Sequence, residues 1–168
     1  VIPLTPKAFE TLCLLVEKGL RVILNPAPVQ ELNAKVFQHL YIITPNEFEA
    51  EMLTGIRVID LKTAEQAAMK LHESGVRNVV ITLGQKGAYL HNETTAKLIP
   101  APLVTATDTT AAGDCFNGAL AVAIAEDLSL ENAVAFACKA ASISVTRMGA
   151  QASLPYRKEV NELSLLTK

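Results

Sequence analysis

The 168-residue sequence has no tryptophan, only three cysteines and no long hydrophobic run. Its longest apolar stretch, Gly118–Ala125, is far shorter than the roughly 18 residues that a membrane span requires, so a membrane partner is not expected. The cysteines Cys13, Cys115 and Cys138 have no C-x-x-C spacing, which is typical of reduced thiols in a cytoplasmic protein. A basic stretch followed by an apolar one, the mark of a secretory signal, is also missing at the start.

Charge of one sign is not in excess, since the net charge is -2 and the isoelectric point is about 5.9. A nucleic-acid partner is therefore not expected. Hydrophobic residues make up 50% of the chain, which excludes disorder because enough apolar surface can be buried to offset the ordering entropy. The P-loop, the dinucleotide fingerprint and the G-x-S-x-G motif are absent from the sequence. The histidines, His39, His72 and His91, are not spaced like metal ligands.

Strand-like and helix-like patterns alternate along the chain. Patterns typical of strands lie at Arg21–Leu24, Tyr41–Thr44, Asn78–Leu83, Gly87–His91 and Ala96–Ala101. Patterns typical of helices lie at Thr5–Gly19, Asn46–Leu53, Thr63–Ser74, Asp114–Ala125, Leu130–Val145 and Tyr156–Leu166. Strands separated by helices predict a single α/β domain over residues 1–168, with a mostly parallel sheet and helices on both faces.

Polar residues and a glycine follow three of the predicted strands. Asn25 follows the first strand, Thr44–Asn46 end the second, and Gly84 comes after Asn78–Leu83. In sheets of this kind, ligands bind beyond the carboxyl ends of the strands. The pattern therefore predicts a binding site at this edge of the sheet before any motif is considered.

The strongest local motif is Asp108–Asp114, in which small residues lead into a helix whose first turn carries an aspartate. Helix N-termini offer unpaired N–H groups and a positive dipole end, and an Ala-Ala-Gly sequence lets a phosphate approach the backbone. A carboxylate there could accept a proton from a hydroxyl that attacks the phosphate. For an isolated Gly-Asp pair, however, the favoured interpretation is that Asp114 only complements the helix dipole.

Two further motifs are ambiguous when each is taken alone. Asn46 and Glu49 follow a strand and share a helix face, and an amide with a carboxylate suits a hydrated Mg²⁺. The favoured interpretation of this pair alone is an asparagine helix cap beside a solvated acidic face formed by Glu47 and Glu51. The segment Ile81–Gly87 places two glycines after a buried strand, and it fits a nucleotide-binding loop and a hairpin turn equally well.

The motifs occur together in one order, which changes their interpretation. That order is NPAP at 25–28, TPNEFEAEMLTG at 44–55, ITLGQKG at 81–87, DTTAAGDCFNGAL at 108–120 and TRMGAQ at 146–151. The set resembles the ribokinase-like (phosphofructokinase-B-type) carbohydrate kinases, and the fourth motif is similar to that family's very specific second signature. The resemblance extends from Val1 to about Leu163. It implies a three-layer α/β/α fold and transfer of the ATP γ-phosphoryl group to the primary hydroxyl of a pentose such as D-ribose.

The resemblance also implies a role for each motif residue. Asp114 would be the catalytic base, beside an anion hole formed by Ala111, Ala112 and Gly113. Asn46 and Glu49 would position Mg²⁺ and phosphate. The residues that would bind ATP are Asn46, Thr82, Gly84, Gln85, Gly87, Gly113 and Cys138, the last of which departs from an expected histidine. A K⁺ site, made mostly of backbone carbonyls, would comprise Asp108, Thr110, Ser144, Arg147, Gly149 and Ser153.

The family's sugar-recognition elements do not occur in this sequence. These elements are a Gly-Gly-x-Gly-x-Asn motif, an early aspartate for the sugar hydroxyls, and a small β-lid through which family dimers form. We therefore expect the chain, which begins at Val1 without a methionine, to be the C-terminal nucleotide-binding half of a longer kinase, with homodimerisation a property of the full-length protein. A truncated, catalytically silent nucleotide-binding module is the alternative, and a purely structural α/β module would not need these motifs. The intact Gly113-Asp114 pair favours an active lineage.

Overall fold

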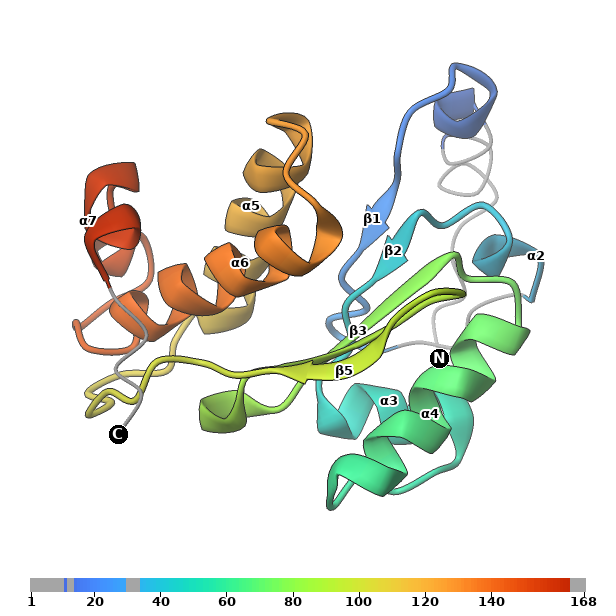
Figure 1. Ribbon diagram of the computed structural model, residues 1–168, viewed down its shortest axis with the longest axis horizontal. Coiled ribbons are helices and arrows are strands. Elements are labelled where there is room, and N and C mark those ends of the chain that lie inside the picture. The colour runs from blue at the N-terminus through green and yellow to red at the C-terminus, as the bar shows by residue number, and fades with distance from the viewer. Residues whose placement is uncertain (1–10, 12–13, 30–33, 164–168) are drawn as a thin grey trace. The chain divides into compact units, whose positions relative to one another are not determined.

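The structure is a computed structural model in which residues 11, 14–29 and 34–163 are described (Figure 1). The chain forms two compact units. The first unit comprises Val1–Leu83 and Tyr89–Leu98, and the second comprises Gly84–Ala88 and Ile99–Lys168.

Among the described residues, five strands form one sheet in which the strand order follows the chain: β1 (Ile23–Leu24), β2 (Ile42–Ile43), β3 (Asn78–Thr82), β4 (Ala88–His91) and β5 (Ala96–Ile99). The first three strands are parallel, with Ile42 paired to Asn78 and Ile43 to Val79. Residues 78–81 are all buried, which is the pattern of a strand covered on both faces. A turn in which the Asn92 N–H donates to the Thr95 carbonyl at 2.8 Å links β4 to β5.

The first unit also contains the helices α2 (Ala34–Phe37), α3 (Glu47–Thr54) and α4 (Leu61–Glu73). Helix α4 buries Ala64, Ala67, Ala68 and Leu71 in a core that it shares with Val79 and Ile81 of β3. This helix begins two residues before the predicted Thr63. The reason is a capping box in which the Thr63 N–H donates to Asp60 Oδ1 at 2.8 Å, while Thr63 Oγ1 accepts the Asp60 N–H at 3.0 Å.

The second unit contains α5 (Ala112–Ala125), α6 (Leu130–Ser144), α7 (Arg157–Glu162) and the short 3₁₀ turns η1 (Gly84–Lys86) and η2 (Gln151–Ser153). Helices α5 and α6 pack against each other over most of their length. Their buried residues are largely small, such as Ala123, Ala133 and Ala137, and small side chains let two helix backbones approach closely. Ser129 caps α6, accepting the Asn132 N–H at 3.4 Å.

These elements confirm the predicted α/β class and its largely parallel sheet. The helix predicted at Thr5–Gly19 lies mostly outside the described residues. The helix predicted at Tyr156–Leu166 is described only up to residue 163, and α7 covers Arg157–Glu162 of it. Within the described part of the chain, no helix has both the length and the apolar character that a membrane crossing needs.

Candidate active site

In the first unit, the parallel register brings Asn46, Glu49 and Thr82 together at the carboxyl ends of β2 and β3. Asn46 forms an isolated parallel bridge with Thr82, and the Thr82 N–H donates to the Pro45 carbonyl at 2.9 Å. Thr44 extends the pairing of β2 with β1, because its N–H donates to the carbonyl of Leu24, the last residue of β1, at 2.9 Å. Asn46, predicted to follow β2, therefore lies beside Thr82, the last residue of β3, while the place of Asn25 and Gly84 at this edge stays a prediction.

Asn46 and Glu49 form a reciprocal cap at the start of α3. The Glu49 N–H donates to Asn46 Oδ1, and Glu49 Oε2 accepts the Asn46 N–H, both at 2.9 Å. Glu49 is only 7% exposed, so its carboxylate is held in a fixed orientation. The capping interpretation of this motif is thus correct, and the cap uses the single side-chain oxygen of Asn46 and one of the two carboxylate oxygens of Glu49. Their role toward Mg²⁺ stays a prediction.

The loop between β3 and β4 belongs to the second unit from Gly84 onward. Gly84 and Gly87 both have positive φ, of 55° and 107°, and the Gly87 N–H donates to the Gly84 carbonyl at 3.1 Å. Such backbone angles favour glycine, so the turn alone accounts for both residues. Gln85 between them is exposed. The nucleotide-binding role of this loop remains a prediction beside its structural one.

Helix α5 begins without a side-chain cap. Ala111 is the N-cap residue in the left-handed region, with φ 58°, and its carbonyl accepts the Cys115 N–H at 2.9 Å. The first N–H groups of a helix have no partner within the helix, so this start presents donors that no capping side chain satisfies. Gly113 and Asp114 are exposed in this first turn. The geometry suits an anion beside a carboxylate.

Residues far apart in the sequence meet around Asp108. Its Oδ1 accepts the N–H and the hydroxyl of Thr110 at 2.9 and 2.6 Å, and its Oδ2 accepts the Gly149 N–H at 2.8 Å. The hydroxyl of Thr110, with help from the Gly149 N–H, lowers the pKa of Asp108. The Asp108 N–H in turn donates to the Val145 carbonyl at 3.1 Å. These bonds tie the segment before α5 to the 146–153 loop.

Three other predicted cation-site residues belong to this loop or to the end of α6. The Ser153 hydroxyl donates to the Ala150 carbonyl at 2.7 Å, and the Ser144 hydroxyl donates to the Ala141 carbonyl at 2.9 Å. The Arg147 N–H donates to the Ser144 carbonyl at 3.1 Å. The described residues contain no group of three or more His, Cys, Asp or Glu side chains that could hold a metal ion.

Cys138 lies inside the second unit rather than on its surface. Its side chain is 3% exposed and its Sγ lies 4.0 Å from the Ile99 carbonyl oxygen. Burial raises the pKa of this thiol to about 12, so the group stays neutral and packs as a small apolar residue. Its predicted place beside an adenine ring is untested.

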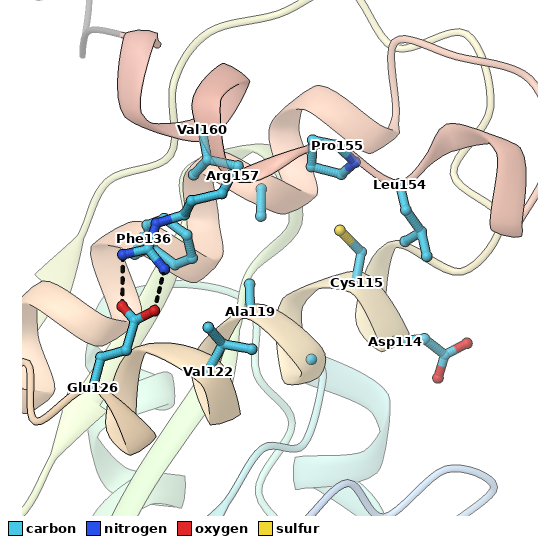
Figure 2. Close-up of a pocket in the computed structure, with 12 residues that line it drawn as sticks. Asp114, Cys115, Ala119, Val122, Glu126, Phe136, Leu154, Pro155, Arg157 and Val160 are labelled. Carbon is cyan, nitrogen blue, oxygen red and sulfur yellow. Dashed lines mark hydrogen bonds and ion pairs between the residues drawn. The ribbon is translucent and has the colours of Figure 1, made fainter.

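A pocket of about 440 Å³ lies along one side of α5, α6 and α7 (Figure 2). Asp114 lies at one end of it, and an ion pair between Glu126 and Arg157 lies at the other. The Arg157 guanidinium also stacks over the Phe136 ring, 4.5 Å from its centroid. Sequence reasoning missed Glu126, Phe136 and Arg157, because no local pattern links residues so far apart in the chain.

Comparison with known proteins identifies the relatives of this chain. The pfkB family carbohydrate kinase profile matches residues 3–157. A ribokinase of Haemophilus influenzae is 46% identical over 146 residues, which cover 87% of this chain and 48% of the relative. A ribokinase of Mus musculus is 41% identical over 158 residues, covering 91% of this chain and 49% of the relative. The chain thus spans about half the length of these relatives.

Two solved structures have a similar fold. The ribokinase of Thermotoga maritima superimposes with a TM-score of 0.82 at 47% identity, over 90% of this chain and 51% of that one. The Arabidopsis thaliana ribokinase, solved as a complex with ribose and ATP, gives a TM-score of 0.87 at 32% identity, over 95% and 54% of the two chains. The fold, the order of the motifs and the profile match over residues 3–157 agree. The chain belongs to the pfkB family of carbohydrate kinases.

Proposed function

We propose that this chain is the nucleotide-binding part of an ATP-dependent sugar kinase that phosphorylates the primary hydroxyl of a pentose such as ribose. The observation that carries the proposal is the start of α5, where Asp114 stands in an exposed first turn that lacks a side-chain cap. Relatives at 41–46% identity are ribokinases, which supports ribose as the sugar. The Arabidopsis enzyme that shares the fold was solved with ribose and ATP bound.

In the proposed reaction, the Asp114 carboxylate accepts the proton of the sugar hydroxyl as its oxygen attacks the γ-phosphorus. The bond between the γ-phosphorus and the bridging oxygen breaks, and ADP leaves with that electron pair. The backbone N–H groups of residues 111–114 stabilise the charge on the transferring phosphoryl oxygens. The helix start that carries these groups is already ordered, and of them the Ala112 N–H would exchange its bond to the Thr109 carbonyl, 3.2 Å long, for a phosphoryl oxygen.

The motif residues would hold ATP and Mg²⁺. Glu49 fits an Mg²⁺ that keeps most of its waters, because the cap engages only one of its two carboxylate oxygens and the carboxylate is already oriented, while Asn46 Oδ1 would have to share its lone pairs between the Glu49 N–H and the ion or its water. Thr82, Gly84, Gln85 and Gly87 would contact the nucleotide, with Gly113 at the phosphates and Cys138 near the adenine. Mg²⁺ supplies charge neutralisation on the phosphates when bound.

A K⁺ ion would bind at the Asp108 cluster, which comprises Asp108, Thr110 and Gly149. Carbonyl groups would supply most of its ligands. Both Asp108 oxygens already accept hydrogen bonds, and the Ser153 hydroxyl donates to Ala150. Asp108 Oδ1 already accepts two hydrogen bonds, but Oδ2 accepts only the Gly149 N–H and, like the Ser153 hydroxyl oxygen, keeps a lone pair that a cation can share. A cation there would stabilise the segment that leads into α5 rather than touch the sugar.

The whole enzyme requires more than this chain, because the expected sugar-recognition elements do not occur in it. A catalytically silent nucleotide-binding module is the second candidate, favoured by that absence alone. A cytoplasmic location belongs to the proposal and is supported by the buried, unpaired thiols of Cys115 and Cys138. The proposal also includes homodimerisation of the full-length kinase.

Two experiments separate the candidates. The first is a calorimetric titration of the chain with ATP and Mg²⁺, in which both candidates predict binding and a purely structural module predicts none at millimolar nucleotide. The second uses a chimera in which the chain replaces the matching 146 residues of the Haemophilus influenzae ribokinase. Ribose-dependent ADP release by the chimera supports an active kinase, and nucleotide binding without turnover supports the silent module.

A further inference from the structure

Two ion pairs fasten helix α7 to the rest of the second unit, and they reach different places. Arg157 of α7 forms a bidentate pair with Glu126, at 2.7 and 2.6 Å, at the carboxyl end of α5. Glu159 of α7 pairs with Arg147, which lies in the loop that follows α6. Only the second pair therefore touches the loop that contacts Asp108.

The Glu159 carboxylate is fully engaged. It accepts hydrogen bonds from both terminal nitrogens of Arg147, the longer of them at 3.5 Å, and its Oε2 also accepts the Tyr156 N–H at 2.8 Å. The Arg147 guanidinium and the Tyr156 N–H lower the pKa of Glu159, so the group is charged at neutral pH. A planar guanidinium held in this way fixes direction as well as distance. Arg147 thus anchors its loop at a defined position.

A short chain of contacts runs from Arg147 to the start of α5. Gly149, two residues after Arg147, has φ 89° and donates its N–H to Asp108 Oδ2 at 2.8 Å. The other Asp108 oxygen accepts both donors of Thr110, the residue that precedes the left-handed Ala111. All these contacts lie within the second unit, and the most distant partners, Asp108 and Gly149, are 41 residues apart in the sequence.

We propose that Glu159 is a positioning residue that holds the 146–153 loop through Arg147, and thereby holds Asp108, Thr110 and the uncapped start of α5. The proposal deepens the proposed function and rests on it, because the group positioned is the one that would bind the phosphates. Glu159 itself touches neither nucleotide nor sugar. Loss of its charge should free the loop and weaken nucleotide binding while the rest of the unit stays folded.

The Glu126–Arg157 pair supplies a matched control. It fastens the same helix, with exposed partners and comparable geometry, but its other end lies at the far terminus of α5. If α7 acted only as general support, Glu126→Gln and Glu159→Gln would have the same effects. If Glu159 acts through the loop, only Glu159→Gln should alter the Asp108 cluster.

The test measures amide exchange with solvent by NMR on the full 168-residue chain, for wild type, Glu159→Gln, Glu126→Gln and the swapped double variant Arg147→Glu/Glu159→Arg. We expect Glu159→Gln to speed exchange of the Gly149 and Thr110 amides about fivefold or more, with unchanged exchange in the middle of α6. The swap should restore slow exchange, and Glu126→Gln should leave both amides as in wild type. ATP titration with Mg²⁺ should give a several-fold weaker affinity for Glu159→Gln alone.

Unchanged exchange of Gly149 in Glu159→Gln overturns the proposal. Equal acceleration in Glu126→Gln overturns it too, because the effect would then be general loosening of α7. If wild type binds no ATP, the proposed function fails, and the exchange rates by themselves decide whether Glu159 holds the loop.

Discussion

Gly87 packs so closely against the backbone at Ile99 that a side chain has no room there. A Cβ on Gly87 would overlap the Ile99 carbonyl oxygen and would lie 2.7 Å from the Ala101 amide nitrogen. The φ of 107° adds strain for any other residue. We therefore expect Gly87→Ala to lower the free energy of unfolding by roughly 2–4 kcal/mol, measured by urea denaturation.

Gly118→Ala is the matched control for that substitution. Gly118 lies within α5, and a Cβ there would meet nothing within 4 Å. Alanine should stabilise the helix by up to about 1 kcal/mol. Equal stability of wild type and Gly87→Ala would contradict the close approach.

The cap at Asn46 predicts a stability effect that is separable from any effect on binding. Asn46→Ala removes the acceptor for the Glu49 N–H and should cost about 1 kcal/mol of folding free energy, measured by thermal or urea denaturation. Asn46→Ser keeps a good capping oxygen and should keep the stability. If the amide also contacts Mg²⁺ or phosphate, Asn46→Ser should nevertheless bind ATP more weakly. If Asn46→Ser binds ATP with wild-type affinity, Asn46 acts only as a helix cap.

The histidine pair of the first unit predicts how stability depends on pH. The His91 ring meets the His72 ring edge-on at 5.3 Å, and His91 Nδ1 is buried with no hydrogen-bond partner among the described residues. Burial, and then the neighbouring His72, lower the pKa of His91 below 6.5, while Glu65 and Glu73 act weakly in the opposite direction. The unfolded chain then binds more protons than the folded one, so stability is full above about pH 6.5 and falls below it.

Denaturant titrations of wild type between pH 7.5 and 5 would measure this loss. His91→Phe keeps a ring of similar shape and removes the titrating group, so its stability should vary less with pH across the same range. The contribution of His91 is refuted if wild type and His91→Phe lose stability in parallel.

Asp114→Asn keeps the shape of the side chain but cannot accept a proton. In the chimera with the Haemophilus influenzae ribokinase, loss of a general base should lower kcat by about 10²–10⁴-fold. ATP affinity should stay within about twofold of wild type, because the backbone N–H groups remain. If the Asp114→Asn chimera keeps a near-normal kcat, a group other than Asp114 accepts the proton.

The K⁺ proposal predicts that the chimera loses rate when K⁺ is replaced by Na⁺ or by a large organic cation. The reason is that the carbonyl-rich site around Asp108 would order the start of α5 less well around an ion of the wrong size. Asp108→Asn keeps the acceptor for Thr110 but removes the charge, so it should abolish the preference for K⁺. Equal rates in all three cations would argue against the site.

Local signals in the sequence were sufficient to predict most helix ends. Gly55 ends α3 in the left-handed region, and Asn46 caps its start, as residue type and spacing indicate. The start of α4 was placed two residues late, although Asp60 and Thr63 have the spacing of a capping box. The capping box therefore sets the start of this helix two residues before its apolar periodicity indicates.

Other features depend on packing that no short segment encodes. The left-handed Ala111 is one, since alanine has no preference for that conformation and only its surroundings hold it there. The bonds of Asp108 to Gly149 and of Glu126 to Arg157 are others, because their partners are 41 and 31 residues apart. The candidate site was therefore predictable as a set of motifs, but its supporting contacts were not.

The strand order of the sheet has a consequence for how the protein is made. Each strand lies beside the one synthesised before it, from β1 through β5. A strand leaving the ribosome can therefore pair at once with a neighbour that is already present, and none must wait for a later segment to be inserted between them. The loop-closure cost is lowest between β4 and β5, because β4 ends at His91 and β5 begins at Ala96. We expect the sheet to assemble during translation in the direction of synthesis, with its growing edge always at the newest strand.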